Sequence, residues 1–342
     1  YTNMVFPEAA PEEWLNCDQC TDCFKPSFNY RPKQSAQYAL ALSNFEQSKD
    51  APQRYNFGFI ASTDDHTARP GTGYKQYERR KMTFATGVKS KIWEYKNDAE
   101  DPNFPEIPKI TPGESQPDSE RVSSFVYPGG ILAVHANGRG KDQIWTALKN
   151  KNVYGTSGPR ILLWFDLINS PEGKVPMGSE ITMSQNPRFQ VKAAGSYKQN
   201  AGCSPESIDS LSPQRLEYLC AGECYNPSNE RHIIERIEII KITPQSYPGE
   251  AISPLIQDAW KIIPCQGTGE CIVEFEDNNF SRDSVYYVRA LQEAGPAING
   301  APLFEREGFK ICKGSFRTGL EDNCLSMTNE RAWSSPIYIN KP

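Results

Sequence analysis

The stretch "ERIEIIKI", residues 235–242, decides the fold class of the second half of this 342-residue chain. Apolar and polar side chains nearly alternate along it, as is typical of a β-strand with one buried face and one wet face. We therefore expect residues 161–342 to form an antiparallel, sandwich-like β region. Comparable runs, with no convincing helix between them, are "RILLWFDLI" (160–168), "RFQVKAAG" (188–195), "CIVEFE" (271–276), "SVYYVRALQ" (284–292) and "PIYIN" (336–340).

Residues 1–160 have a different pattern, which predicts an α/β region. The segment 35–47, "SAQYALALSNFEQ", has the composition of a helix, and 55–62, "YNFGFIAS", is typical of a short buried strand. A second strand is predicted at 129–136, followed by a helix at 140–151 and a turn-rich segment at 152–160. Residues 97–121 are acidic and proline-rich, so we expect a long surface loop there.

Composition argues against two classes of partner. Lys and Arg number 37 against 42 Asp and Glu, and no basic stretch is interleaved with aromatic residues, so a nucleic acid is not expected. The longest apolar runs are far shorter than the roughly 20 residues that a membrane-spanning helix requires. The sequence thus predicts neither nucleic-acid binding nor a membrane span.

Ten cysteines favour an oxidising compartment, either periplasmic or secreted. The later ones lie in polar, glycine-rich loops that disulfides often staple. The early run "CDQCTDC" (17–23) also has the spacing of a metal or cluster site, but no fourth ligand is nearby. Three early and seven late cysteines, if all are bonded, require at least one bridge between the groups. The disulfide candidates are Cys17, Cys20, Cys23, Cys203, Cys220, Cys224, Cys265, Cys271, Cys312 and Cys324.

A candidate metal site follows the predicted strand at 55–62. Asp64 and His66 are two residues apart, so on an extended backbone their side chains point the same way, while Asp65 points the opposite way. Carboxylate and imidazole together suit Zn, Mn or Fe(II). The other interpretation is a turn, in which His66 caps the loop and the aspartates bind its backbone.

Three further positions extend this candidate site. His135 ends the second predicted strand and is a candidate third ligand, although a buried, hydrogen-bonded core residue fits equally well. Ser157 and Arg160, in "YGTSGPR", are candidates for anion binding together with Arg69. The alternative is a structural turn with Arg160 in an ordinary ion pair. His232 begins a strand of the second half, and we expect a structural role for it.

Several motifs resemble one uncharacterised bacterial family, the domain of unknown function numbered 3604, in its C-terminal part. They are "GFIASTDDHTARPGTGY" (58–74), the stretch 129–161, "VPMGSEI" (175–181) and "NERAWSSPIYI" (329–339). The family is placed in the PHP superfamily, named after polymerase and histidinol phosphatase. The resemblance implies a distorted (β/α)7 barrel with up to three metal ions, whose last metal motif, Asp-x-His, corresponds to Asp64 and His66.

The resemblance also implies a reaction, because the characterised PHP proteins mostly hydrolyse phosphoesters. The H-x-H motif with which PHP barrels begin is absent, and two ligands do not hold a catalytic zinc ion. We therefore expect either a preceding segment or chain that completes the barrel, or a degenerate site. The expected function is a metal-dependent phosphoesterase with a small-molecule substrate. The alternative is a secreted binding or structural protein with a ligand-binding β domain.

Overall fold

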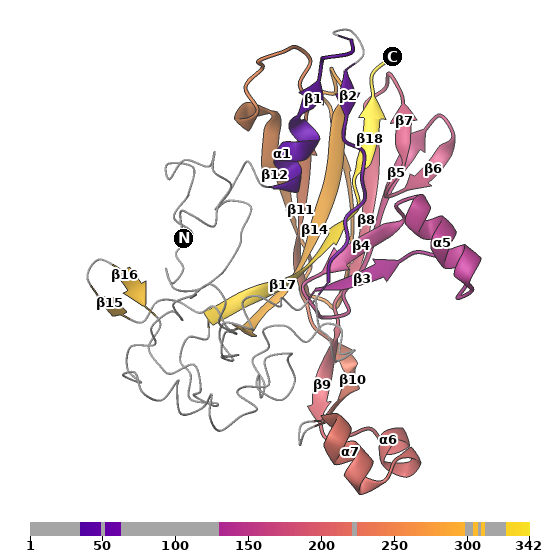
Figure 1. Ribbon diagram of the computed structural model, residues 1–342, viewed down its shortest axis with the longest axis vertical. Coiled ribbons are helices and arrows are strands. Elements are labelled where there is room, and N and C mark those ends of the chain that lie inside the picture. The colour runs from indigo at the N-terminus through magenta and orange to yellow at the C-terminus, as the bar shows by residue number, and fades with distance from the viewer. Residues whose placement is uncertain are drawn as a thin grey trace, which may run out of the picture.

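The chain folds into two packed β-sheets with few helices (Figure 1). This computed structural model describes residues 35–48, 52–62, 130–220, 224–297, 304–306, 309–311 and 326–342. The β-rich fold expected for the second half is confirmed.

The larger sheet has eight strands, in the order β12-β11-β14-β17-β4-β3, with β18 paired to β14 and β7 paired to β18. All of its pairs are antiparallel except β18 with β7. The strands are β3 (Ile131–Val134), β4 (Val153–Thr156), β7 (Glu180–Thr182), β11 (Ile234–Ile242), β12 (Ile256–Pro264), β14 (Ser284–Ala297), β17 (Ser326–Ser334) and β18 (Ile337–Asn340).

The smaller sheet has four antiparallel strands in the order β13-β8-β5-β6. They are β5 (Leu162–Ser170), β6 (Gly173–Pro176), β8 (Arg188–Ala194) and β13 (Glu270–Glu276). Three short pairs stand apart from both sheets: β1 (Ser43–Asn44) with β2 (Gln53–Arg54), β9 (Tyr197–Ala201) with β10 (Tyr225–Arg231), and β15 (Phe304–Arg306) with β16 (Phe309–Ile311).

The main core lies between the two sheets. Phe165, Phe189 and Phe275 of the smaller sheet stack on one another, with ring centroids 4.9 to 6.4 Å apart. Phe189 also contacts Tyr286 of the larger sheet, at 4.8 Å between centroids. Aromatic pairs at these separations add stabilisation beyond the burial of their area. These contacts bind the two sheets into a sandwich.

A second core covers the outer face of the larger sheet. Leu40 and Ala41, from helix α1 (Ala36–Ala41), pack there on Ile240 and Ile242 of β11. Phe57 and Phe59, from the segment 55–62, pack beside them. In Figure 1 this segment descends along the sheet between α1 and β18. The central strands β11 and β14 of the larger sheet are therefore buried on both faces along most of their length.

Strand β11 is buried on both faces and not on one face, as its alternating pattern predicts. Ile237 and Ile239 face the main core, whereas Ile240 and Ile242 face the outer core. Consecutive strand residues point to opposite faces, so the pair Ile239–Ile240 requires apolar surroundings on both sides. The prediction that this strand has one wet face is wrong, because α1 and the segment 55–62 cover its outer face.

The first half also differs from the prediction. Helix α1 ends at Ala41, before the predicted end, because Ser43 leaves the helix to hydrogen-bond Gln245, with its Oγ donating to the Gln245 carbonyl at 2.8 Å. The segment 55–62 is extended but forms no ladder. Part of 152–160, predicted as turn-rich, is strand β4, whereas helix α5 (Lys141–Lys149) and strand β3 are confirmed.

The described residues show no (β/α)7 barrel. A barrel requires neighbouring parallel strands, but β3 pairs with β4 antiparallel and β4 pairs with β17 antiparallel. Strands on both sides of residue 160 thus share the larger sheet, and the division into domains 1–160 and 161–342 stays a prediction. The predicted loop 97–121 lies outside the described residues.

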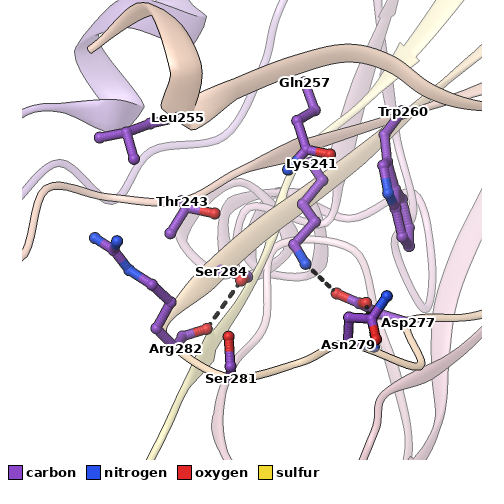
Figure 2. A pocket seen from close by; sticks show the side chains of 10 residues that line it. All are labelled: Lys241, Thr243, Leu255, Gln257, Trp260, Asp277, Asn279, Ser281, Arg282 and Ser284. Carbon is purple, nitrogen blue, oxygen red and sulfur yellow. Dashed lines mark hydrogen bonds and ion pairs between the residues drawn. The ribbon is translucent and has the colours of Figure 1, made fainter. Parts of the chain in front are cut away.

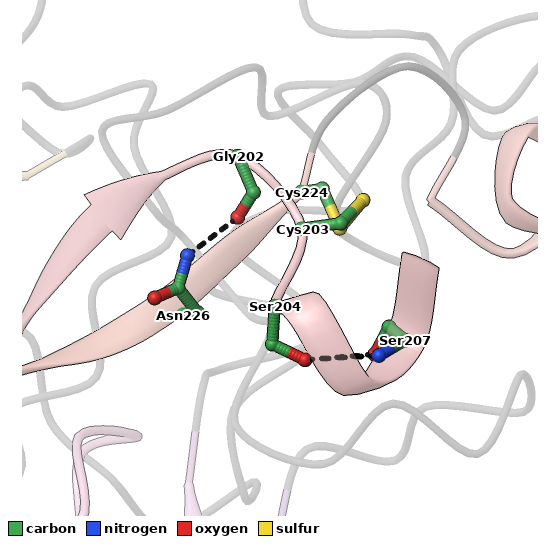
Figure 3. Close-up of a disulfide and its surroundings, with 6 residues drawn as sticks. All are labelled: Gly202, Cys203, Ser204, Ser207, Cys224 and Asn226. Carbon is green, nitrogen blue, oxygen red and sulfur yellow. Dashed lines mark hydrogen bonds between the residues drawn. A yellow bond between two sulfur atoms is a disulfide. The ribbon is translucent and has the colours of Figure 1, made fainter. Parts of the chain in front are cut away.

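An arm projects from one end of the sandwich, carrying helices that we did not predict (Figure 1). Strands β9 and β10 lead to α6 (Pro205–Ser210) and α7 (Pro213–Cys220). Ser204 caps α6, and its side chain accepts a hydrogen bond from the Ser207 amide at 3.3 Å. The Ser-Pro pair at 204–205 is a helix-start signal that we overlooked. The disulfide Cys203–Cys224 joins the ends of β9 and β10 where the helical part of the arm begins (Figure 3).

A partly buried arginine–carboxylate pair holds the turn after β11, near the short helix η4 (Ser253–Leu255). Arg282 donates two hydrogen bonds to the carboxylate of Glu250, at 2.8 and 3.0 Å, and a third to the Pro244 carbonyl at 2.9 Å. The hydrogen bonds from Arg282 lower the pKa of Glu250 from an ordinary 4.5 to about 2. This carboxylate therefore stabilises the fold in its charged form.

We predict that Glu250→Gln flattens the acid side of the stability profile. Because the pKa of Glu250 is depressed on folding, its contribution is complete above about pH 4.5 and is lost as pH falls towards 2. At neutral pH the variant should lose about 2 kcal/mol, measured by urea unfolding. Its stability should then fall less steeply than that of wild type between pH 4.5 and 2. The exposed Glu206→Gln is the control, and its free energy of unfolding should depend on pH as that of wild type does. The same pH dependence in Glu250→Gln and wild type would contradict this account.

Candidate functional site

Asp64, His66 and Arg69 lie outside the described residues, but the segment that leads to them is described. The Phe57 amide donates to the Tyr338 hydroxyl at 2.9 Å, and that hydroxyl donates to the Phe57 carbonyl at 2.7 Å. The Phe59 amide donates to Ser335 Oγ at 3.0 Å. Burial raises the pKa of Tyr338, which keeps its hydroxyl protonated as a donor. The approach to Asp64 is thus fixed to the larger sheet.

Two glycines allow the end of this segment to pack closely against β3 and β4. A Cβ atom on Gly155 would lie 2.8 Å from the Cβ of Ala61, and one on Gly130 would lie 2.9 Å from the backbone of Ser62. Glycine is required where two backbones approach so closely. Ser62, two residues before Asp64, therefore rests on the sheet beside the start of β3.

Ser157 lies at this same end of the β3–β4 pair. Ile131 pairs with Thr156, so Gly130 and Ser157 flank that pair. The Ser157 hydroxyl donates to the Glu330 carboxylate and accepts a hydrogen bond from the Arg331 amide at 2.9 Å. The structure thus brings Ser157 near the approach to Asp64, with its hydroxyl bonded to β17.

Arg331 is a cationic residue at this place that we did not predict. Its side chain is largely buried, and its Nε has no hydrogen-bond partner within the described ranges. Burial, followed by the charge of Arg289, lowers the pKa of Arg331. No local pattern reveals it, because 174 residues separate it from Ser157.

Arg160 does not join this group. It is exposed in the turn between β4 and β5, and no carboxylate in the described part of the chain pairs with it. The ordinary ion pair that we weighed for it is therefore not seen among those residues. Gly158, with a φ of 132°, shapes this turn in a backbone conformation that glycine adopts readily.

His135 lies at the opposite end of β3 from Gly130. Its Nε2 donates to the Leu163 carbonyl at 2.8 Å, and its ring packs between Tyr154 and Trp164, with centroids 5.3 and 5.7 Å away. It also borders a cavity of about 590 Å³ beside α5, lined in part by Asp142 and Asn152. The hydrogen bond fits the core interpretation of His135, but the residue is only partly buried. The hydrogen bond through Nε2 leaves Nδ1 as the nitrogen that a ligand would meet.

The described residues do not fit a metal centre by themselves. They contain no group of three or more His, Cys, Asp or Glu side chains placed to hold an ion. His232, the other described histidine, bonds through Nδ1 to Glu293 Oε1 at 2.7 Å, which matches its expected structural role. A metal site in this protein would therefore depend on Asp64 and His66 and on further ligands beyond the described residues.

Two disulfides are present among the described cysteines, Cys203–Cys224 and Cys265–Cys271. The side chains of the other six candidates lie outside the description. Stable disulfides indicate a compartment other than the cytoplasm. None of the helices in the described part of the chain has the length and apolar character needed to cross a membrane.

We predict that His135→Ala is a stability variant and not a metal-site variant. It removes the bond to Leu163 and the packing on Tyr154 and Trp164, which should cost about 1–3 kcal/mol in urea unfolding. Metal content, measured by elemental analysis, should not change. Loss of metal with unchanged stability would instead identify His135 as a ligand.

Comparison with known proteins gives one match. Residues 42–201 match the family model described as "Protein of unknown function (DUF3604)". No curated protein and no solved structure matches the chain. The matched region contains Asp64, His66, His135 and Ser157. The chain is therefore similar to this family over residues 42–201.

Proposed function

We propose that this chain is part of a metal-dependent hydrolase of PHP type, a phosphoesterase, in which Asp64 and His66 bind the metal. The motif resemblance suggests the reaction, and the family match includes both residues. Sites that hold ligands precisely are built on well-supported elements. The observation that carries the proposal is the attachment of 57–62 to the larger sheet, ending where Ser62 packs on Gly130.

The metal would be Zn, Mn or Fe, with up to three ions in the complete site. Such an ion supplies hydroxide near neutral pH and offsets the charge of a phosphoester. Arg331 lies on the neighbouring strand β17, and its backbone amide donates to Ser157 at this end of the sheet.

The remaining ligands would come from a segment or chain beyond the described residues. Exposed apolar side chains beside β3 support such a partner, since Ile60, Leu132 and Trp145 are 68%, 37% and 59% exposed. Clustered apolar exposure is typical of a contact surface. We place the protein in the periplasm or outside the cell, because of its disulfides.

The second candidate function is a secreted binding protein with a degenerate metal site. A polar pocket in the sandwich, around Lys241 and Asp277, favours it.

Elemental analysis and a phosphodiesterase assay with bis(p-nitrophenyl) phosphate test the proposal, using the natural full-length protein. Wild type should hold at least one divalent ion per chain and hydrolyse this substrate. Asp64→Ala and His66→Ala should each lose metal, and activity should fall by more than about 100-fold.

Asp65→Ala is the matched control, because its side chain is expected to point away from the ion. It should retain metal and most of the activity. Metal-free wild-type protein with no activity would favour the binding protein. Equal losses in all three variants would contradict the assignment of Asp64 and His66 as the ligand pair.

A further inference from the structure

A polar pocket lies at the opposite edge of the larger sheet from β3. It has a volume of about 350 Å³, near the lower end of the range for small-molecule sites. Figure 2 shows Lys241 and Trp260 entering from one side, and Asp277 and Asn279 from the other. They come from β11, β12 and the connection between β13 and β14. Gln257, Ser281 and Arg282 complete the polar lining.

A buried ion pair borders this pocket. Lys241 and Asp277 are 8% and 0% exposed, and Lys241 Nζ lies 2.5 Å from Asp277 Oδ2. Oδ2 also accepts the Tyr286 hydroxyl at 2.5 Å, and Oδ1 accepts the Asn279 amide at 3.0 Å. Burial alone would raise the pKa of Asp277, but these hydrogen bonds lower it, so the carboxylate is charged. An apolar pair of similar volume would often be as stable, so stability alone does not explain the ion pair.

Lys241 retains hydrogen-bonding capacity. An ammonium group has three donors, and within the described residues Asp277 is its hydrogen-bond acceptor. Its other neighbours are ring faces, with the Trp260 and Tyr286 centroids 5.3 and 5.9 Å from Nζ. Asp277 Oδ1 accepts one amide and has a second lone pair for another donor. The pair thus offers a donor and an acceptor side by side.

The charged residues that line the pocket are paired, whereas Lys261 lies beyond the lining, with Nζ 4.4 Å from the Trp260 ring and donating to the Glu276 carbonyl. Lys241 is paired with Asp277, and Arg282 is paired with Glu250 through two hydrogen bonds. An anionic ligand would meet two cations that are already neutralised, and would also meet the Asp277 carboxylate. A hydroxyl group both donates and accepts, so it can bond Lys241 and Asp277 together. The pocket therefore suits a neutral ligand with adjacent hydroxyl groups.

We propose that this pocket binds a neutral sugar, with adjacent hydroxyls held by Lys241 and Asp277. Asn279 and Gln257 provide exposed amides at the rim, and Trp260 forms the apolar wall. The polar groups would fix the orientation of the ligand, and the aromatic ring offers an apolar surface beside them. The site is independent of Asp64 and His66, so it does not rest on the proposed hydrolase function.

Isothermal titration calorimetry tests this proposal on the full-length protein. The probes are methyl glycosides of neutral hexoses, pentoses, deoxyhexoses and N-acetylhexosamines, together with the corresponding hexuronates. At least one neutral glycoside should bind with Kd on the order of 1 mM, as expected for so small a ligand. The hexuronate of the same sugar should bind more weakly. Tighter binding of the hexuronate would overturn the choice of a neutral ligand.

Two neighbouring asparagines give a matched pair of variants. Asn279 lines the pocket, whereas Asn278 is exposed and does not. Asn279→Ala should weaken binding by about tenfold with unchanged Tm, and Asn278→Ala should bind as wild type. Lys241→Met should abolish binding. Because this substitution also leaves Asp277 without its ion-pair partner, the Tm of the variant is measured as well. Binding to none of the neutral glycosides by folded wild type, or binding equal in both asparagine variants, would overturn the proposal.

Discussion

Burial of the central strands of the larger sheet, β11 and β14, on both faces is the constraint on which the rest of this structure depends. Ile237 and Ile239 fill the main core, and the next residues along β11 with the opposite orientation, Ile240 and Ile242, need a second cover. Each such side chain contributes about 1.5–3 kcal/mol when buried. Helix α1 and the segment 55–62 supply that cover, so they belong to the fold and are not accessories to it.

This outer layer also connects the fold to the proposed chemistry. The segment that covers Ile240 and Ile242 continues to Ser62, two residues before the Asp-x-His motif, and we propose that the same packing supports the candidate ligands. The pocket at Lys241 lies at the other edge of the sheet, because β12 and β3 are the first and last strands in the sheet order. A metal site and a sugar site would thus lie at opposite edges of one sheet and would fail independently on mutation.

The sequence predicted the strands whose apolar period is strong, including β5, β8, β11, β13 and β14, because a buried strand face requires that period. It did not predict β4, because the glycine in "VYGT" indicates a turn. In the structure Gly155 is part of the strand and allows Ala61 to pack closely against it. The position of the segment 55–62 on the sheet and the contact of Ser157 with Arg331 depend on the strand order of the larger sheet. Local sequence patterns do not predict that order. The sequence also did not predict the buried pair Lys241–Asp277, because a lysine within an isoleucine run is expected to face solvent.

Hydrogen exchange at the Phe57 and Phe59 amides tests most directly whether the segment 55–62 is a fixed layer of the fold. Both amides donate to side chains of the sheet, Tyr338 and Ser335. If the layer is integral, they should exchange only through the global unfolding that also exposes the β14 amides, with a similar free energy of opening. Exchange near the rate of an unprotected loop, while β14 stays protected, would contradict this account and remove the support proposed for Asp64 and His66.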